Sequence, residues 1–102
     1  MSRKSSPTLL SLPKTMDVFG LRYDIVMRDD LENDNSASGL VKFKACQVLI
    51  ESSLSYDMAV STLIHEIIEI ANDSLELSLE HRTICGLEVA VYQALKSGNL
   101  IE

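Results

Sequence analysis

Between Tyr56 and Asp73, apolar residues recur every three or four positions, which is the spacing of an amphipathic helix. The positions that follow this spacing are Ala59, Val60, Leu63, Ile64, Ile67, Ile68 and Ala71. Ser55 directly precedes the run and suits an N-cap, and Asp57 places a negative charge in the positively polarised first turn. The pattern predicts one long helix over residues 56–73 with an apolar face toward the core.

Short segments rich in β-branched residues precede this helix and predict strands. Alternating apolar residues from Leu21 to Met27 favour one strand, with an earlier strand at Met16–Phe19 and a turn at Gly20. The stretch Asp29–Gly39 is rich in Asp, Asn, Ser and Gly, which is typical of a loop. The following LVKFKACQVLIE predicts two short strands, the second near Cys46–Glu51.

A second helix is expected after the linker SLELS. Ser78 can cap it, and it should end near Ser97–Gly98. Its expected apolar face consists of Leu79, Ile84, Leu87, Val91 and Leu95. The order of strands followed by two helices predicts a small α+β domain with both helices against a short sheet.

The chain has 102 residues, which suffices for one domain with a modest core. Its first fourteen residues carry three cations and no acids, whereas the remaining 88 carry six cations against fifteen acids. We expect residues 1–14 to be a disordered basic tail and residues 15–102 to form a single domain. The acidic domain would repel nucleic-acid phosphates, so we expect no nucleic-acid partner.

The sequence also bears on the compartment. No apolar run approaches the roughly 18 residues that a membrane span requires, and the N-terminal stretch lacks the apolar region of a secretory signal. We therefore expect a reduced, cytoplasmic protein without membrane association and without a disulfide between Cys46 and Cys85. The oligomeric state stays open.

The long helix carries His-Glu-Ile-Ile-Glu from His65 to Glu69, where a zinc peptidase would read His-Glu-x-x-His. On a helix His65 and Glu69 are about 6 Å apart along the axis and point the same way, so both can bind one metal ion. Glu66 is rotated by about 100° from His65. It would flank the metal, in the position of a general base.

A catalytic zinc site needs a third protein ligand. His81 is the other histidine of the chain, and antiparallel packing of the two helices would bring it near Glu69. His65, Glu69 and His81 would then form a His₂Glu set, which favours zinc over magnesium or calcium. The competing interpretation is that an acidic helix contains this pattern by chance and that His81 is a surface residue.

Two further residues of the second helix are close to His81 in sequence. Cys85 follows one turn later and could reach a metal, although a small buried thiol in the core is its more common role. Glu88 is about 10 Å along the helix from His81, which is too far for the same ion. We therefore do not expect Glu88 and His81 to bind the same ion.

The segment 39–95 resembles small phage and prophage zincin-like metallopeptidases, which are distantly related to the ImmA/IrrE group. The residues that carry the resemblance are Gly39, Thr62, His65, Glu66, Glu69, His81 and the closing VYQAL. It extends over roughly residues 16–95 and implies a minimal zincin-like fold, with a short sheet packed against an active-site helix and a second, C-terminal helix. It also implies zinc ligands at His65, Glu69 and His81, and a general base at Glu66.

The resemblance implies a zinc-dependent peptidase of the bacterial host cytoplasm, in which a metal-activated water attacks a peptide bond and Glu66 accepts its proton. The strand near Cys46–Glu51 would be the sheet edge along which a peptide or host protein lies. One alternative is a non-catalytic protein on the same scaffold that binds and inhibits a host protein. Another is a structural metal whose fourth coordination position is closed by a residue such as Cys85.

Overall fold

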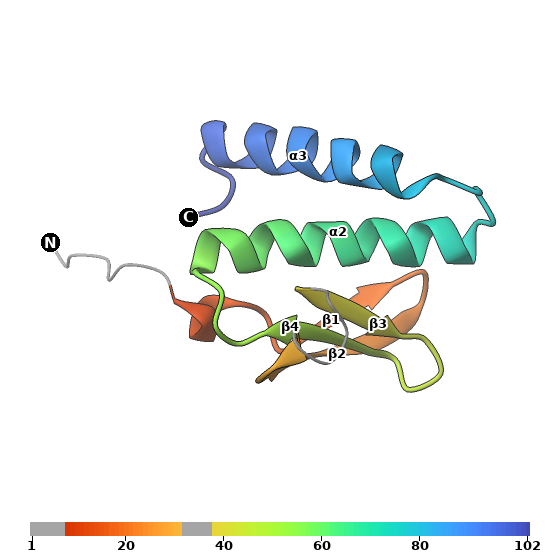
Figure 1. Ribbon diagram of the computed structural model, residues 1–102, viewed down its shortest axis with the longest axis horizontal. Coiled ribbons are helices and arrows are strands. Elements are labelled where there is room, and N and C mark those ends of the chain that lie inside the picture. The colour runs from red at the N-terminus through yellow and green to blue at the C-terminus, as the bar shows by residue number, and fades with distance from the viewer. Residues whose placement is uncertain (1–7, 32–37) are drawn as a thin grey trace, which may run out of the picture.

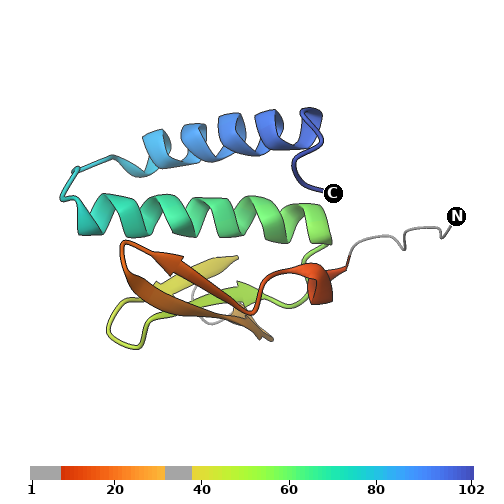
Figure 2. The same cartoon turned by 180° about the vertical axis from the view of Figure 1, so that it is seen from behind.

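The computed structural model describes residues 8–31 and 38–102, which form three layers (Figures 1 and 2). A four-stranded sheet forms one outer layer, helix α2 (Tyr56–Ser74) lies on it, and helix α3 (His81–Ser97) lies on α2. The predicted α+β class is confirmed. The second helix packs on the first helix rather than against the sheet, so α2 is covered on two sides.

The sheet is mixed, with the strand order β1-β2-β4-β3. Its strands are β1 (Thr15–Val18), β2 (Leu21–Arg28), β3 (Gly39–Lys42) and β4 (Gln47–Glu51). The predicted turn at Gly20 joins β1 and β2 into an antiparallel hairpin. Phe19 and Gly20 have φ angles of 50° and 81°, which is the left-handed backbone that a tight two-residue hairpin requires.

Strand β4 lies inside the sheet, so the predicted edge position of Cys46–Glu51 was wrong. It pairs in parallel with β2 on one side and antiparallel with β3 on the other. Val48, Leu49 and Ile50 are all buried, as a continuous apolar run in a central strand is expected to be. Within the described residues, β3 is therefore the edge strand on this side of the sheet.

Helix α2 matches its prediction closely. The Ser55 side chain accepts a hydrogen bond from the backbone N–H of Met58 and so caps the first turn. One side of the helix packs with Val48, Ile50 and other residues of the sheet in the main core. The other side meets α3, and this double contact explains why the apolar stripe of α2 is so wide.

Helix α3 begins later than predicted and turns a different face inward. Glu80 occupies the N-cap position and Ser78 has a φ angle of 56°, so the predicted Ser78 cap was wrong. Ile84 is buried, whereas Leu87 and Val91 of the predicted apolar face are 43% and 40% exposed. The predicted inner face was therefore wrong in part.

The structure describes the predicted N-terminal tail and the predicted loop only in part. Residues 1–7 of the expected tail and residues 32–37 of the expected loop lie outside the described residues. Leu9–Ser11 form a short 3-10 helix, and Leu12 packs into the core. Packing therefore begins before the expected boundary at residue 15. Among the described helices, none is long and apolar enough to cross a membrane.

Candidate metal centre

His65 and Glu69 lie one turn apart on the face of α2 that meets the start of α3. His65 Nε2 is 3.6 Å from Glu69 Oε2, and the two side chains are 14% and 34% exposed. Their i, i+4 spacing on a helix turns both side chains in the same direction. The imidazole and the carboxylate can therefore contact one ion from a single rigid element.

His81, the first residue of α3, joins this pair from the second helix. Figure 1 shows α3 running back along α2 in the opposite direction, so its first turn lies beside the second half of α2. Donor atoms of His65, Glu69 and His81 all lie within 4.8 Å of one another, and the two imidazole centroids are 5.4 Å apart. The structure thus brings together the three residues that the sequence spacing singled out.

This donor set fits a zinc ion. Ligands at about 2.0–2.2 Å from zinc in a tetrahedron lie about 3.3–3.5 Å apart, so the observed positions need side-chain adjustments of only about 1 Å. Two imidazoles and one carboxylate match the donor preference of zinc better than that of magnesium or calcium. The three residues are therefore able to hold zinc.

Glu66 lies beside this set and is buried, with 6% of its surface exposed. The pKa of its carboxyl is raised from 4.5 to about 7, mainly by burial; the neighbouring His65 lowers it, and the carboxylates of Glu69 and Glu88 raise it. A carboxyl of this pKa exchanges a proton readily near neutral pH. Such a group is suited to general acid–base chemistry.

Gly39, the first residue of edge strand β3, makes room for Glu66. A Cβ atom at residue 39 would lie 2.6 Å from Thr62 Cγ2 and 2.9 Å from Glu66 Oε2, which is closer than carbon atoms can pack. The absence of a side chain at residue 39 therefore lets the edge strand lie directly over the Glu66 carboxyl. The backbone of this strand therefore covers one side of the carboxyl.

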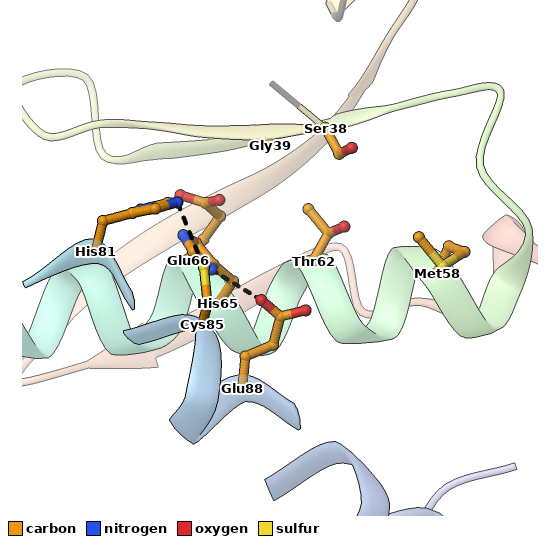
Figure 3. A pocket seen from close by; sticks show the side chains of 9 residues that line it. All are labelled: Ser38, Gly39, Met58, Thr62, His65, Glu66, His81, Cys85 and Glu88. Carbon is orange, nitrogen blue, oxygen red and sulfur yellow. Dashed lines mark hydrogen bonds and ion pairs between the residues drawn. The ribbon is translucent and has the colours of Figure 1, made fainter. Parts of the chain in front are cut away.

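Glu88 contacts the site through His65, and the candidate metal groups do not combine it with His81. Its Oε1 is 2.9 Å from His65 Nδ1 (Figure 3). Its Oε2 accepts a hydrogen bond from the Ser61 hydroxyl. With Glu88 ionised, its carboxylate only accepts hydrogen bonds, so the His65 tautomer that bonds to it carries the proton on Nδ1 and leaves the Nε2 lone pair for a metal. Carboxylates commonly orient metal-binding histidines in this way.

The contact between Glu88 and His65 was missed from the sequence because only the distance along α3 was considered. In an antiparallel helix pair, each step of four residues back along one helix matches a step of four forward along the other. Once Glu69 faces His81, His65 faces Cys85, and Ser61 lies near Glu88. The same pairing of His81 with Glu69 could therefore have indicated the contact.

Two adjoining clefts open at the donor set. The first is lined by His65, Glu66, His81 and Glu88 among others, and has a volume of about 310 Å³ (Figure 3). The second extends from Glu69 along the edge strand, where it is lined by Leu40, Val41 and Phe43. The site is thus accessible from solvent and continuous with the sheet edge.

The whole chain, which includes the site, was compared with known proteins. Any function assigned to the site rests on the residues His65, Glu66, Glu69 and His81 and on their geometry. Comparisons with protein-family models, with curated proteins and with solved structures returned no match to this chain.

Proposed function

We propose that this protein is a zinc-dependent peptidase of the zincin-like phage type, with His65, Glu69 and His81 as metal ligands and Glu66 as general base. The observation that carries the proposal is the convergence of three donor atoms within 4.8 Å, next to a buried carboxyl with a pKa of about 7. A metal-ligand set beside a carboxyl of perturbed pKa is typical of hydrolytic sites.

In this proposal Glu88 orients the metal ligand His65. When bound at such a site, zinc supplies a Lewis acid that polarises a carbonyl and lowers the pKa of water. Glu88 accepts a hydrogen bond from His65 Nδ1, which directs the Nε2 lone pair toward Glu69 and His81. His81 is exposed and Glu69 is partly exposed, so the site has an open side for a substrate.

Glu66 supplies the proton transfer in this proposal. With a pKa of about 7, its carboxylate can accept a proton from the attacking water and return it to the leaving amine. Gly39 lies against its side chain, so the edge strand covers this carboxyl. A base in this position lies beside the ligand set, which proton transfer requires.

The edge strand β3 indicates an extended peptide as the substrate class. β3 lies at the edge of the sheet beside the site, and the cleft that contains Glu69 continues along it. An extended peptide can pair with such an edge through its backbone, and its side chains can then contact Leu40 and Phe43. This arrangement would bring a peptide bond past the ligand set.

The test compares wild type with Glu66→Gln and His81→Ala, each purified without added metal. Elemental analysis should find zinc in wild type and in Glu66→Gln but not in His81→Ala. Cleavage of a mixed peptide library should fall by about 10²–10⁴-fold in Glu66→Gln, which keeps the metal but loses the base. Cleavage that persists unchanged in Glu66→Gln contradicts the assignment of the base, and wild type without bound metal contradicts the whole proposal.

A second candidate function is a non-catalytic protein that binds and inhibits a host protein. The observation that favours it is one side of α3, where Leu87 and Val91 are 43% and 40% exposed. Exposed apolar residues of this size often mark interaction surfaces. Under this candidate, inhibition of the host protein survives Glu66→Gln unchanged and is lost in Leu87→Asp.

We propose the bacterial cytoplasm as the compartment in which the protein acts. Cys46 and Cys85 are both free thiols. Free thiols persist in a reducing compartment, whereas oxidising compartments favour disulfides.

A further inference from the structure

Cys85 lies next to the proposed ligand set, one turn after His81 on α3. Its Sγ is 3.4 Å from His81 Nε2. Donor atoms of Cys85, His65 and Glu88 also lie within 4.8 Å of one another. Figure 3 shows Cys85 and His81 on α3 directed toward His65 on α2. The thiol is therefore in contact with one proposed ligand and close to a second.

The distances of Cys85 and Glu88 from the two histidines indicate different roles for these two residues. A nitrogen and a sulfur bound to one tetrahedral zinc at about 2.0 and 2.3 Å lie about 3.5 Å apart, and the Cys85–His81 distance of 3.4 Å matches this value. Glu88 is only 2.9 Å from His65 Nδ1, a hydrogen-bond distance on the ring nitrogen that faces away from Glu69. The Cys85–His81 distance is thus compatible with two ligands of one ion, whereas Glu88 lies where it can position His65.

We propose that Cys85 is a fourth metal ligand that closes the site in the resting protein. This inference rests on the proposed metal centre. With Cys85 bound as a thiolate, His65, Glu69, His81 and Cys85 complete a tetrahedral set, and the charges of Glu69 and Cys85 balance a divalent cation. A closed set has no position for a substrate, so Cys85 must leave the metal before a peptide can be cleaved. The thiol therefore limits the activity of the site.

The chain contains a matched control, because Cys46 is its second cysteine. Cys46 precedes β4, its thiol lies 3.7 Å from the Phe43 carbonyl, and it belongs to neither group of candidate metal ligands among the described residues. Cys85→Ser and Cys46→Ser therefore remove the same atom from two different surroundings. Far-ultraviolet circular dichroism establishes that each variant is folded.

The experiment titrates metal-free protein with cobalt(II) and records the absorption spectrum. A cobalt–thiolate bond gives a charge-transfer band in the near ultraviolet. We expect the band in wild type and in Cys46→Ser and not in Cys85→Ser, whose cobalt affinity should fall by about 100-fold as one of four ligands is lost. In the zinc-loaded proteins, turnover per bound metal should be higher in Cys85→Ser than in wild type.

A second measurement uses wild type alone and needs no substitution. Bound zinc should slow the alkylation of Cys85 by iodoacetamide at least about tenfold, because a coordinated thiolate is no longer a free nucleophile. Alkylation of Cys46, followed by peptide mapping in the same sample, should keep its rate. Cobalt that binds without the band, or equal alkylation of Cys85 with and without zinc, overturns the role of Cys85 and leaves the metal centre standing. Absence of metal binding in wild type overturns both proposals.

Discussion

The two surfaces of α2 are built from different chemistry. Toward the sheet, α2 packs Ala59 and Leu63 in one apolar core with Val48 and Ile50, both fully buried. Toward α3, the contacts include polar pairs, namely Ser61–Glu88, His65–Glu88 and Asp57–Lys96. Within α3 only Ile84 is buried. The first surface stabilises the fold, and the second holds the candidate site.

This difference explains the exposed residues of α3. The positions of α3 that face α2 near the site carry Cys85 and Glu88, so fewer inward positions remain for apolar side chains. Leu87 and Val91 stay partly exposed beside these polar positions. Polar groups in a helix interface contribute less to stability than apolar packing, and they can be retained for the specific contacts that they make. We therefore expect mutations to affect the two surfaces differently.

The largest effect on stability is expected at the sheet surface. Ile50→Ala should lower the free energy of unfolding by about 4 kcal/mol, because a fully enclosed cavity cannot collapse. Ile84→Ala, the same change in the other surface, should cost about 2 kcal/mol, since α3 can settle onto α2. Urea denaturation of the metal-free proteins measures both values. Equal losses would mean that the two surfaces pack alike.

The next effect concerns Glu69 at the other surface. Structural zinc sites bind with about 10–16 kcal/mol over four ligands, so Glu69→Ala should weaken zinc by about 3 kcal/mol, or about 100-fold. Glu69→His should retain zinc, because it restores His-Glu-x-x-His at the same helical spacing. Elemental analysis of wild type and both variants measures occupancy. Equal zinc content in all three proteins would show that Glu69 is an ordinary helix residue.

The buried carboxyl of Glu66 gives a pH-dependent effect in metal-free protein. Its pKa of about 7 in the folded state exceeds the ordinary value of 4.5, so unfolding releases a proton between these values and stability falls as pH rises through this window. Glu66→Gln has no such proton. It should be more stable than wild type by roughly 2–3 kcal/mol at about pH 8 and equally stable at about pH 4. Denaturant titrations with a chelator at both values measure the difference; a pH-independent difference would contradict the raised pKa.

A smaller effect on metal affinity is expected from the residues that position His65. Glu88→Ala should weaken zinc by about 10–100-fold, as removal of a carboxylate behind a metal-binding histidine usually does. Ser61→Ala removes only the hydrogen bond to Glu88 and should have a weaker effect in the same direction. Competition with a chromophoric chelator measures both affinities. A loss of thermal stability in the metal-free variants without any change in affinity would make Glu88 a structural residue only.

The smallest effect is expected on the outer face of α3. Leu87→Ser should change the free energy of unfolding by less than about 0.5 kcal/mol, because the side chain is already 43% exposed. The matched comparison is Ile84→Ala on the same helix. A loss of several kcal/mol in Leu87→Ser would mean that Leu87 faces inward, as the apolar spacing alone predicted.

Several features could be read from short stretches of sequence because local forces determine them. The cap at Ser55, the hairpin turn at Gly20 and the end of α3 near Gly98 all depend on residues within a few positions. The wide apolar stripe of α2 follows from helical periodicity, which can be read from the sequence whichever elements cover the helix. The alignment of His65 with Glu69 has the same origin, since it needs only one turn of helix.

Other features depend on which segments meet, and this only the tertiary structure decided. The edge position of β3 follows from the parallel pairing of β2 with β4, a choice made between strands far apart in sequence. The inward face of α3 depends on its register against α2, and that register also brings Glu88 to His65. The need for glycine at residue 39 arises from the approach of β3 to Glu66. Spacing along a chain specifies which side chains share a face, whereas packing between elements specifies what that face touches.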